Sequence, residues 1–219
     1  MKKLLIGLKE KYIAAIRGVG DYVKPIQDQQ KRVKKASNDV SNCMYYDHAK
    51  LREIMRTESD KLHELQAEKA AIVTTVKDAA EEVRGQVRQM VNASMIVSAE
   101  AIDPAEACLL ISGLYTDDQI RALAEKHSTN NSMLRVISHY ASMRESLKGL
   151  SAQIDDRNGG TLIRRVNNLI AVGDRAVTVS GIGQDGGSVA EIQVSEYTEY
   201  ADRLITEIVE LMNVIQCQK

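Results

Sequence analysis

The chain has 219 residues, an almost balanced charge of 29 Lys or Arg against 30 Asp or Glu, and neither Phe nor Trp. Aromatic side chains supply much of the burial in enzyme pockets and thick globular cores, so their scarcity disfavours both and favours helices packed through small aliphatic residues. No stretch approaches the roughly eighteen apolar residues of a membrane span, and three cysteines without metal-ligand spacing fit a reducing, cytoplasmic compartment. We therefore expect an all-α protein.

Charge is unevenly distributed along the chain. Residues 1–40 carry ten Lys or Arg against four Asp or Glu, whereas residues 182–219 carry seven acidic against two basic residues. Ends of opposite sign can pair with each other or dock on a charged partner. Ordinary solvated helix faces would have the same composition, and both interpretations remain open.

Residues 1–24 are expected to form an amphipathic helix. Leu5, Leu8, Tyr12 and Ile16 fall on one helical face with lysines around it. This face is expected to pack on the next helix, and a membrane surface is the alternative. Pro25 suits the first turn of that next helix.

Residues 25–100 are expected to form a long coiled-coil helix. From Ile26 to Val97 there is no proline and only one glycine, Gly85. As one helix this stretch would be roughly 100 Å long, which a compact domain of this size cannot bury. Its continuity past Asp47 and Gly85 is not determined by the pattern.

A heptad repeat runs along the second half of this segment, interrupted at Lys69 and Gln86. The predicted oligomerisation seam consists of Leu62, Leu65, Ile72, Val76, Ala79, Val83, Met90 and Val97. The seam can pair with a second chain or fold back on the C-terminal helix of its own chain. The pattern leaves open this choice, the number of chains and their direction.

Residues 101–150 are expected to form a small module of three short helices. Asp103-Pro104-Ala105-Glu106 and Thr116-Asp117-Asp118-Gln119 both have a capping residue followed three positions later by Glu or Gln. The sequence Ser128-Thr129-Asn130-Asn131 separates the second helix from a third that carries Met133 and Ile137.

Residues 151–219 are expected to hold a helix from Thr161 to about Val172, a short strand at 176–179 and a Gly-rich loop at 181–187. Ser188-Val189-Ala190-Glu191 then resembles a capping box that starts a long amphipathic helix. The alternative is one short β-hairpin that pairs 176–180 with 188–194. The loop matches the dinucleotide fingerprint in letters, but no run of buried strands surrounds it, so we expect no nucleotide there.

No residue set predicts catalysis, a metal or another cofactor. The four histidines are scattered and no nucleophile with a base at a suitable spacing is present. The best candidate for a docking patch is the basic segment Lys31, Arg32, Lys34 and Lys35. A solvated helix face is the alternative for that segment.

The charged N-terminal helices and the module resemble a family of small helical proteins encoded in structural gene clusters by phages and prophages of Gram-positive bacteria. The resemblance rests on residues 109–127 (LLISGLYTDDQIRALAEKH) and 130–141 (NNSMLRVISHYA) and covers roughly residues 1–145. It implies a virion-assembly setting and supplies no catalytic residues. The segment after about 150 does not match.

The sequence thus favours a non-enzymatic, self-associating phage structural protein, a head scaffold or capsid-associated factor, located in the host cytoplasm or on the virion. Its expected partners are other copies of itself and a capsid or other virion protein. One alternative is a DNA-binding regulator that uses 116–142 as a helix-turn-helix, with Arg135 and His139 on the outer face of its second helix. Another is a membrane-active protein that uses residues 2–17.

Overall fold

The computed structural model describes residues 1–42, 48–94, 99–182 and 186–217. These residues form helices and no strand, which confirms the all-α prediction. The chain divides into two compact units, residues 1–83 with 169–205, and residues 84–168 with 206–219. Three of the described helices contribute residues to both units.

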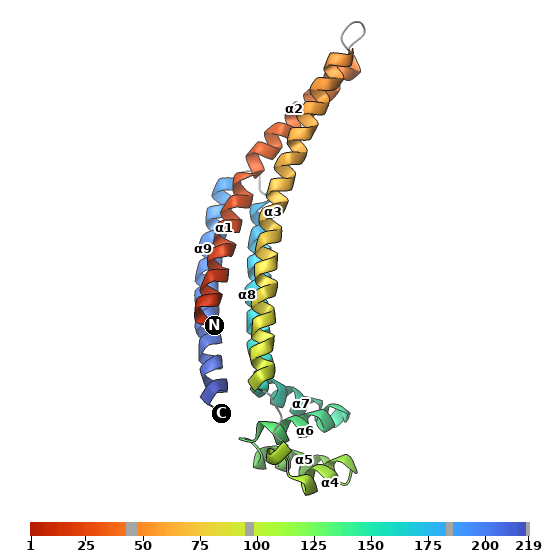
Figure 1. Cartoon of the computed structure of the whole chain (residues 1–219), viewed down its shortest axis with the longest axis vertical. Coiled ribbons are helices and arrows are strands. Elements are labelled where there is room, and N and C mark those ends of the chain that lie inside the picture. The colour runs from red at the N-terminus through yellow and green to blue at the C-terminus, as the bar shows by residue number, and fades with distance from the viewer. Residues whose placement is uncertain (43–47, 95–98, 183–185, 218–219) are drawn as a thin grey trace. The chain divides into compact units, whose positions relative to one another are not determined.

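The helices, labelled in Figure 1, are α1 (Lys2–Asp21), α2 (Val23–Asn42), α3 (His48–Ser94), α4 (Pro104–Ile111), α5 (Asp117–Lys126), α6 (Asn131–Ser142), α7 (Lys148–Asp155), α8 (Thr161–Ser180) and α9 (Gly186–Cys217). Short 3₁₀ segments span Ala99–Ala101 and Glu145–Leu147, and a π-helical turn spans Asp156–Gly160.

The first unit is a bundle in which α1 packs on parts of α3, α8 and α9. The predicted face of α1 is buried, because Leu5, Leu8, Tyr12 and Ile16 are at most 2% exposed. A Cβ atom built on Gly18 would lie 3.1 Å from Ile72 of α3, so the two helix backbones approach closely at that level. The apolar face of α1 is therefore covered by other helices of the bundle.

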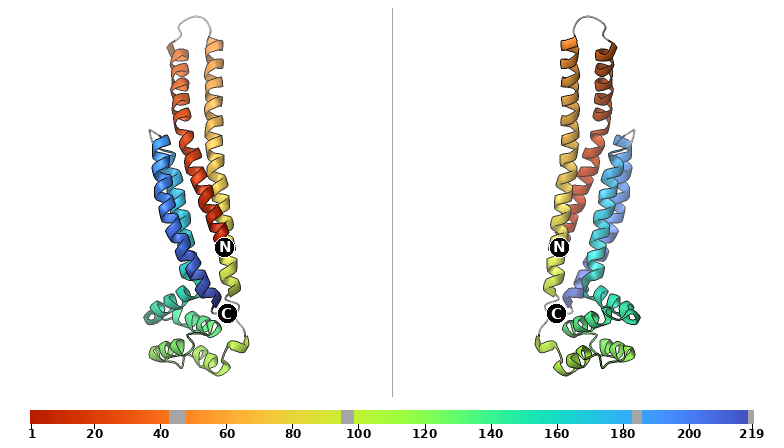
Figure 2. Two further views of the ribbon diagram at one scale, coloured as in Figure 1. Left: turned by 90° about the vertical axis from the view of Figure 1, so that its left-hand side faces the viewer. Right: turned by 90° about the vertical axis from the view of Figure 1, so that its right-hand side faces the viewer.

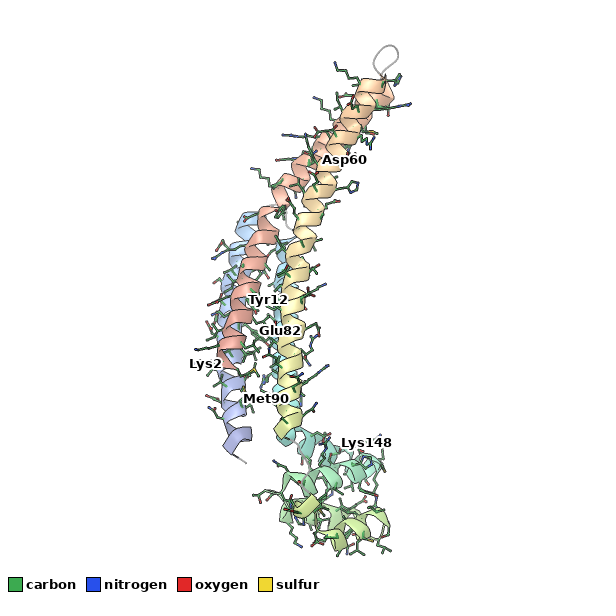
Figure 3. All side chains as sticks on the ribbon, viewed as in Figure 1. Lys2, Tyr12, Asp60, Glu82, Met90 and Lys148 are labelled. Atoms are coloured by element: carbon green, nitrogen blue, oxygen red, sulfur yellow. The ribbon has the colours of Figure 1, made fainter. Side chains whose placement is uncertain are left out.

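Tyr12 is the contact that joins α1 to both C-terminal helices. Its hydroxyl donates to Asp174 Oδ1 of α8 at 2.8 Å, and its ring lies 5.5 Å from that of Tyr197 of α9, measured between centroids. Tyr12 is labelled on α1 in Figure 3. A Cβ on Gly173 would fall 2.6 Å from the Tyr12 ring, so only glycine leaves room for this ring.

The segment 25–100, expected as one long helix, contains two helices that run in opposite directions. Figure 2 shows α2 and the first part of α3 side by side, extending beyond the ends of α8 and α9. Tyr22 donates to Glu68 at 3.0 Å, and buried Gln29 donates to the backbone oxygen of Glu58 at 2.8 Å. We call this pair of helices, residues 26–42 and 48–65, the arm.

Pairing within the arm explains why the chain departs from the single-helix prediction. Eight apolar residues of the two helices are buried or half-buried there, namely Ile26, Val33, Ala36, Val40, Leu51, Met55, Leu62 and Leu65. An unbroken helix would leave both stripes in water, whereas an antiparallel pair covers each with the other. The sequence pattern predicts helix for both the single helix and the antiparallel pair, so it does not distinguish them.

The predicted strand at 176–179, the alternative hairpin with 188–194 and the helix start at Ser188 are all wrong. α8 continues to Ser180, and α9 begins at Gly186, before Ser188. Ala176 and Val177 are each only 4% exposed inside the bundle, so burial on one helical face outweighs the β preference of valine and threonine. Of the predicted loop, residues 183–185 lie outside the described residues.

The second unit holds the predicted module, whose helix starts are confirmed. Asp103 accepts hydrogen bonds from the backbone of Ala105 and Glu106, Thr116 and Gln119 form a reciprocal capping box, and Asn130 caps α6. α7 adds a further helix to the three expected. The core of the module is formed by Leu110, Ile120, Leu123, Ala124, Met133, Leu134, Ile137, Ala141, Leu147 and Ile154.

Gly173→Ala is expected to destabilise the protein by about 2 kcal/mol, because the new methyl group must displace the Tyr12 ring. Gly7→Ala in α1 is the matched control. Nothing lies within 4 Å of its added Cβ, so helix propensity should stabilise that variant by about 0.5–1 kcal/mol. Urea unfolding followed by circular dichroism measures both, and equal effects would contradict the close approach.

Candidate functional site

The predicted seam lies partly inside the folded chain. Val76, Ala79 and Val83 are 3%, 6% and 3% exposed, so a second chain could reach them only if the bundle opened. The members Leu62, Leu65, Ile72 and Met90 are half-buried, and Val97 lies outside the described residues. Only the half-buried members of the predicted seam could therefore contact a second chain while the bundle stays closed.

The predicted docking patch lies on the outer side of the arm. Its four residues Lys31, Arg32, Lys34 and Lys35 are all exposed on α2. Lys31 forms an ion pair with Asp28 at 3.1 Å, and the described residues show no ion pair for Lys34 or Lys35.

The opposite helix of the arm also carries exposed basic residues at the same end. Between residues 31 and 56 the sequence has three acidic residues, Asp39, Asp47 and Glu53. The seven basic residues of that stretch are exposed: Lys31, Arg32, Lys34, Lys35, Lys50, Arg52 and Arg56. Sequence reasoning found only the α2 half, because the antiparallel pairing that brings residues 50–56 beside it was not apparent.

A groove lies where the arm meets the bundle of the first unit. It has a volume of about 600 Å³ and is lined by apolar and amide side chains of α2 and α3 together with Gly181 and Ile182. Lys69 donates to the carbonyl oxygen of Gly181 at 2.6 Å, and burial lowers the pKa of its ammonium group. Lys69, a polar interruption of the predicted seam, therefore makes a hydrogen bond at the end of α8 where the heptad pattern would place an apolar contact.

The helix-turn-helix alternative is not favoured by the burial of its second helix. Ser132, one of the residues at the start of α6 that would contact bases, is only 7% exposed, and Asn131 is half-buried. Arg135 and His139 are exposed as predicted. A recognition helix needs its first residues free to enter the major groove, and here they pack into the module.

A polar cluster that the sequence analysis missed joins α4 to α5. Glu106 accepts from Lys126 and lies 2.5 Å from His127 Nε2. The hydrogen bond from Lys126, followed by that from His127, lowers the pKa of the Glu106 carboxyl group. The sequence does show an acidic residue in the first turn of one helix and two basic residues at the end of the next. Whether these side chains come into contact depends on how the two helices pack.

The described residues contain no group of three or more His, Cys, Asp or Glu placed to hold a metal ion. Among the described helices, none has the length and apolar content needed to cross a membrane. Comparison of the chain with protein families, curated proteins and solved structures finds no match.

Protection of α4 and α5 from hydrogen exchange is expected to fall as the pH is lowered below about 4.5. A carboxyl group whose pKa is lower in the folded state stabilises the fold above its unfolded pKa, and this contribution is lost as the pH falls through the folded pKa. Glu106→Gln should lower protection at pH 7 by about 1 kcal/mol and flatten the pH dependence.

Glu125→Gln, an exposed position on α5, is the control for that measurement and should leave the pH profile unchanged. Exchange rates corrected for their intrinsic pH dependence report the two helices separately within the full chain. An unchanged profile in Glu106→Gln would mean that the Glu106 cluster does not hold the helices together.

Proposed function

We propose that the protein is a non-enzymatic, self-associating assembly protein of a phage or prophage, acting as a head scaffold or capsid-associated factor. The setting comes from the resemblance over residues 1–145. The observation that carries the proposal is the arm, a two-helix projection of the first unit with eight exposed basic residues, seven of which lie between residues 31 and 56. Such a surface suits docking on an acidic protein face.

Two helices can cover each other's apolar stripes but leave their outer faces to water. On the arm those faces are charged, so a partner would be held by many weak electrostatic contacts rather than by a buried apolar core. Exposed ion pairs contribute about 0–1 kcal/mol each and weaken with salt. Contacts of this kind suit a scaffold, which must bind its shell protein and later leave.

The module of the second unit is a further candidate for docking. Its surface exposes large apolar side chains, namely Leu109, Ile111, Leu114 and Met143, which are 40% to 68% exposed. Exposed apolar residues of this size are typical of contact surfaces between proteins when they are contiguous. This supports an assembly role without identifying the partner.

The wild-type chain is expected to form a dimer or larger species whose mass rises with concentration. Light scattering combined with small-angle X-ray scattering measures both mass and extension. A mass of 24.3 kDa at every concentration tested would contradict self-association and with it the proposed function.

Lys34→Glu/Lys35→Glu is expected to reduce cosedimentation with the shell protein of the same structural gene cluster by about tenfold or more, because like charges would then face the acidic partner. Lys2→Glu/Lys3→Glu changes two exposed lysines of α1 and is the charge-matched control, expected to bind as the wild type does. Equal loss in both variants would contradict docking through the patch. Binding of duplex DNA that only the patch variant loses would instead favour the DNA-binding alternative.

A further inference from the structure

Two exposed isoleucines lie on the first unit in stripes of opposite charge. Ile54 on α3 is 44% exposed and Ile192 on α9 is 57% exposed. Residues four and seven positions apart share a helical face. Ile54 therefore shares its stripe with Lys50, Lys61 and the half-buried Glu58, whereas Ile192 shares its stripe with Glu196 and Glu199.

The charges of both stripes are available to a partner. Lys50, Glu196 and Glu199 are exposed and have no ion pair among the described residues. Lys61 pairs with Glu58 at 3.4 Å, and its side chain remains 51% exposed. Glu196 accepts one hydrogen bond from the amide of Gln193.

The two stripes of one chain cannot meet each other. Lys69 contacts Gly181, so the end of α8 lies at the level of residue 69 on α3. Ile54 lies fifteen residues before Lys69, roughly 22 Å along α3 at about 1.5 Å per residue. α9 runs from that level away from the arm (Figure 1), which takes Ile192 farther from Ile54.

We propose that the basic stripe Lys50, Ile54 and Lys61 docks on the acidic stripe Ile192, Glu196 and Glu199 of a second copy. This inference rests on the self-association in the proposed function and names its surface. With Ile54 placed on Ile192, antiparallel helices bring Lys50 opposite Glu196, whereas parallel helices bring Lys61 opposite Glu199 but also Glu58 opposite Glu196. Only the antiparallel direction keeps the described charges of the two stripes opposite in sign.

Each copy carries both stripes, which determines the possible assemblies. A two-fold arrangement makes the contact twice and closes as a dimer, whereas a head-to-tail arrangement makes it once per copy and grows into a filament. The isoleucine pair supplies apolar burial at the centre, and the lysines and glutamates select the partner surface.

Charge reversal with rescue tests the pairing. Lys50→Glu/Lys61→Glu and, separately, Glu196→Lys/Glu199→Lys are each expected to weaken self-association by about tenfold or more, because each places like charges opposite one another. The chain carrying all four changes, and an equimolar mixture of the two double variants, should self-associate again. Sedimentation velocity over a concentration series measures this, with circular dichroism to confirm that each variant is folded.

Lys2→Glu/Lys3→Glu is the charge-matched control and should self-associate as the wild type does. If the wild type associates and neither double variant is weakened, the stripes are not the interface, and self-association itself still stands. If folded double variants are weakened but neither the four-residue variant nor the mixture recovers, the pairing of these two stripes is overturned. A wild type that is monomeric throughout overturns this inference together with the proposed function.

Discussion

The long apolar stripe of α3 has to be covered along 47 residues, a length of about 70 Å. In the first unit its early part pairs with α2 in the arm, and its later part enters the bundle, where Val76 and Ala79 are almost fully buried. In the second unit Val87 and Val91 are each 1% exposed, and Val91 packs against Gly159. Each stretch of α3 is thus covered by other helices of its own chain.

This coverage depends on α1 lying close to α8 and α9. Tyr12 fills the space that Gly173 leaves and donates to Asp174, and ion pairs between Lys9 and Asp202 and between Arg17 and Glu191 follow the same interface. The exposed pairs contribute little by themselves, so the ring packing supplies most of the interface energy. Part of the basic excess of the N-terminal segment therefore pairs with acidic residues of α9.

Because the bundle is completed inside one chain, the surfaces left for a partner lie on the arm and on α9. Apolar residues that the heptad pattern assigned to a second chain are satisfied internally, while charges on the outer faces are left for a partner. Only antiparallel pairing brings the basic residues of α2 and those at 50–56 onto one projection. A self-association surface built from charged stripes is a different prediction from a buried coiled-coil seam, and charge reversal separates the two.

By itself the sequence determined the helical class, the buried face of α1 and the helix starts at Asp103 and Thr116, because capping and helical periodicity act within a few residues. Only the tertiary structure decided that 25–100 forms two antiparallel helices, that residues 176–179 are helical, and that Glu106 meets Lys126 and His127. These features depend on which distant segment covers an apolar face, and a periodic stripe is equally well covered by a neighbouring helix or by a second chain.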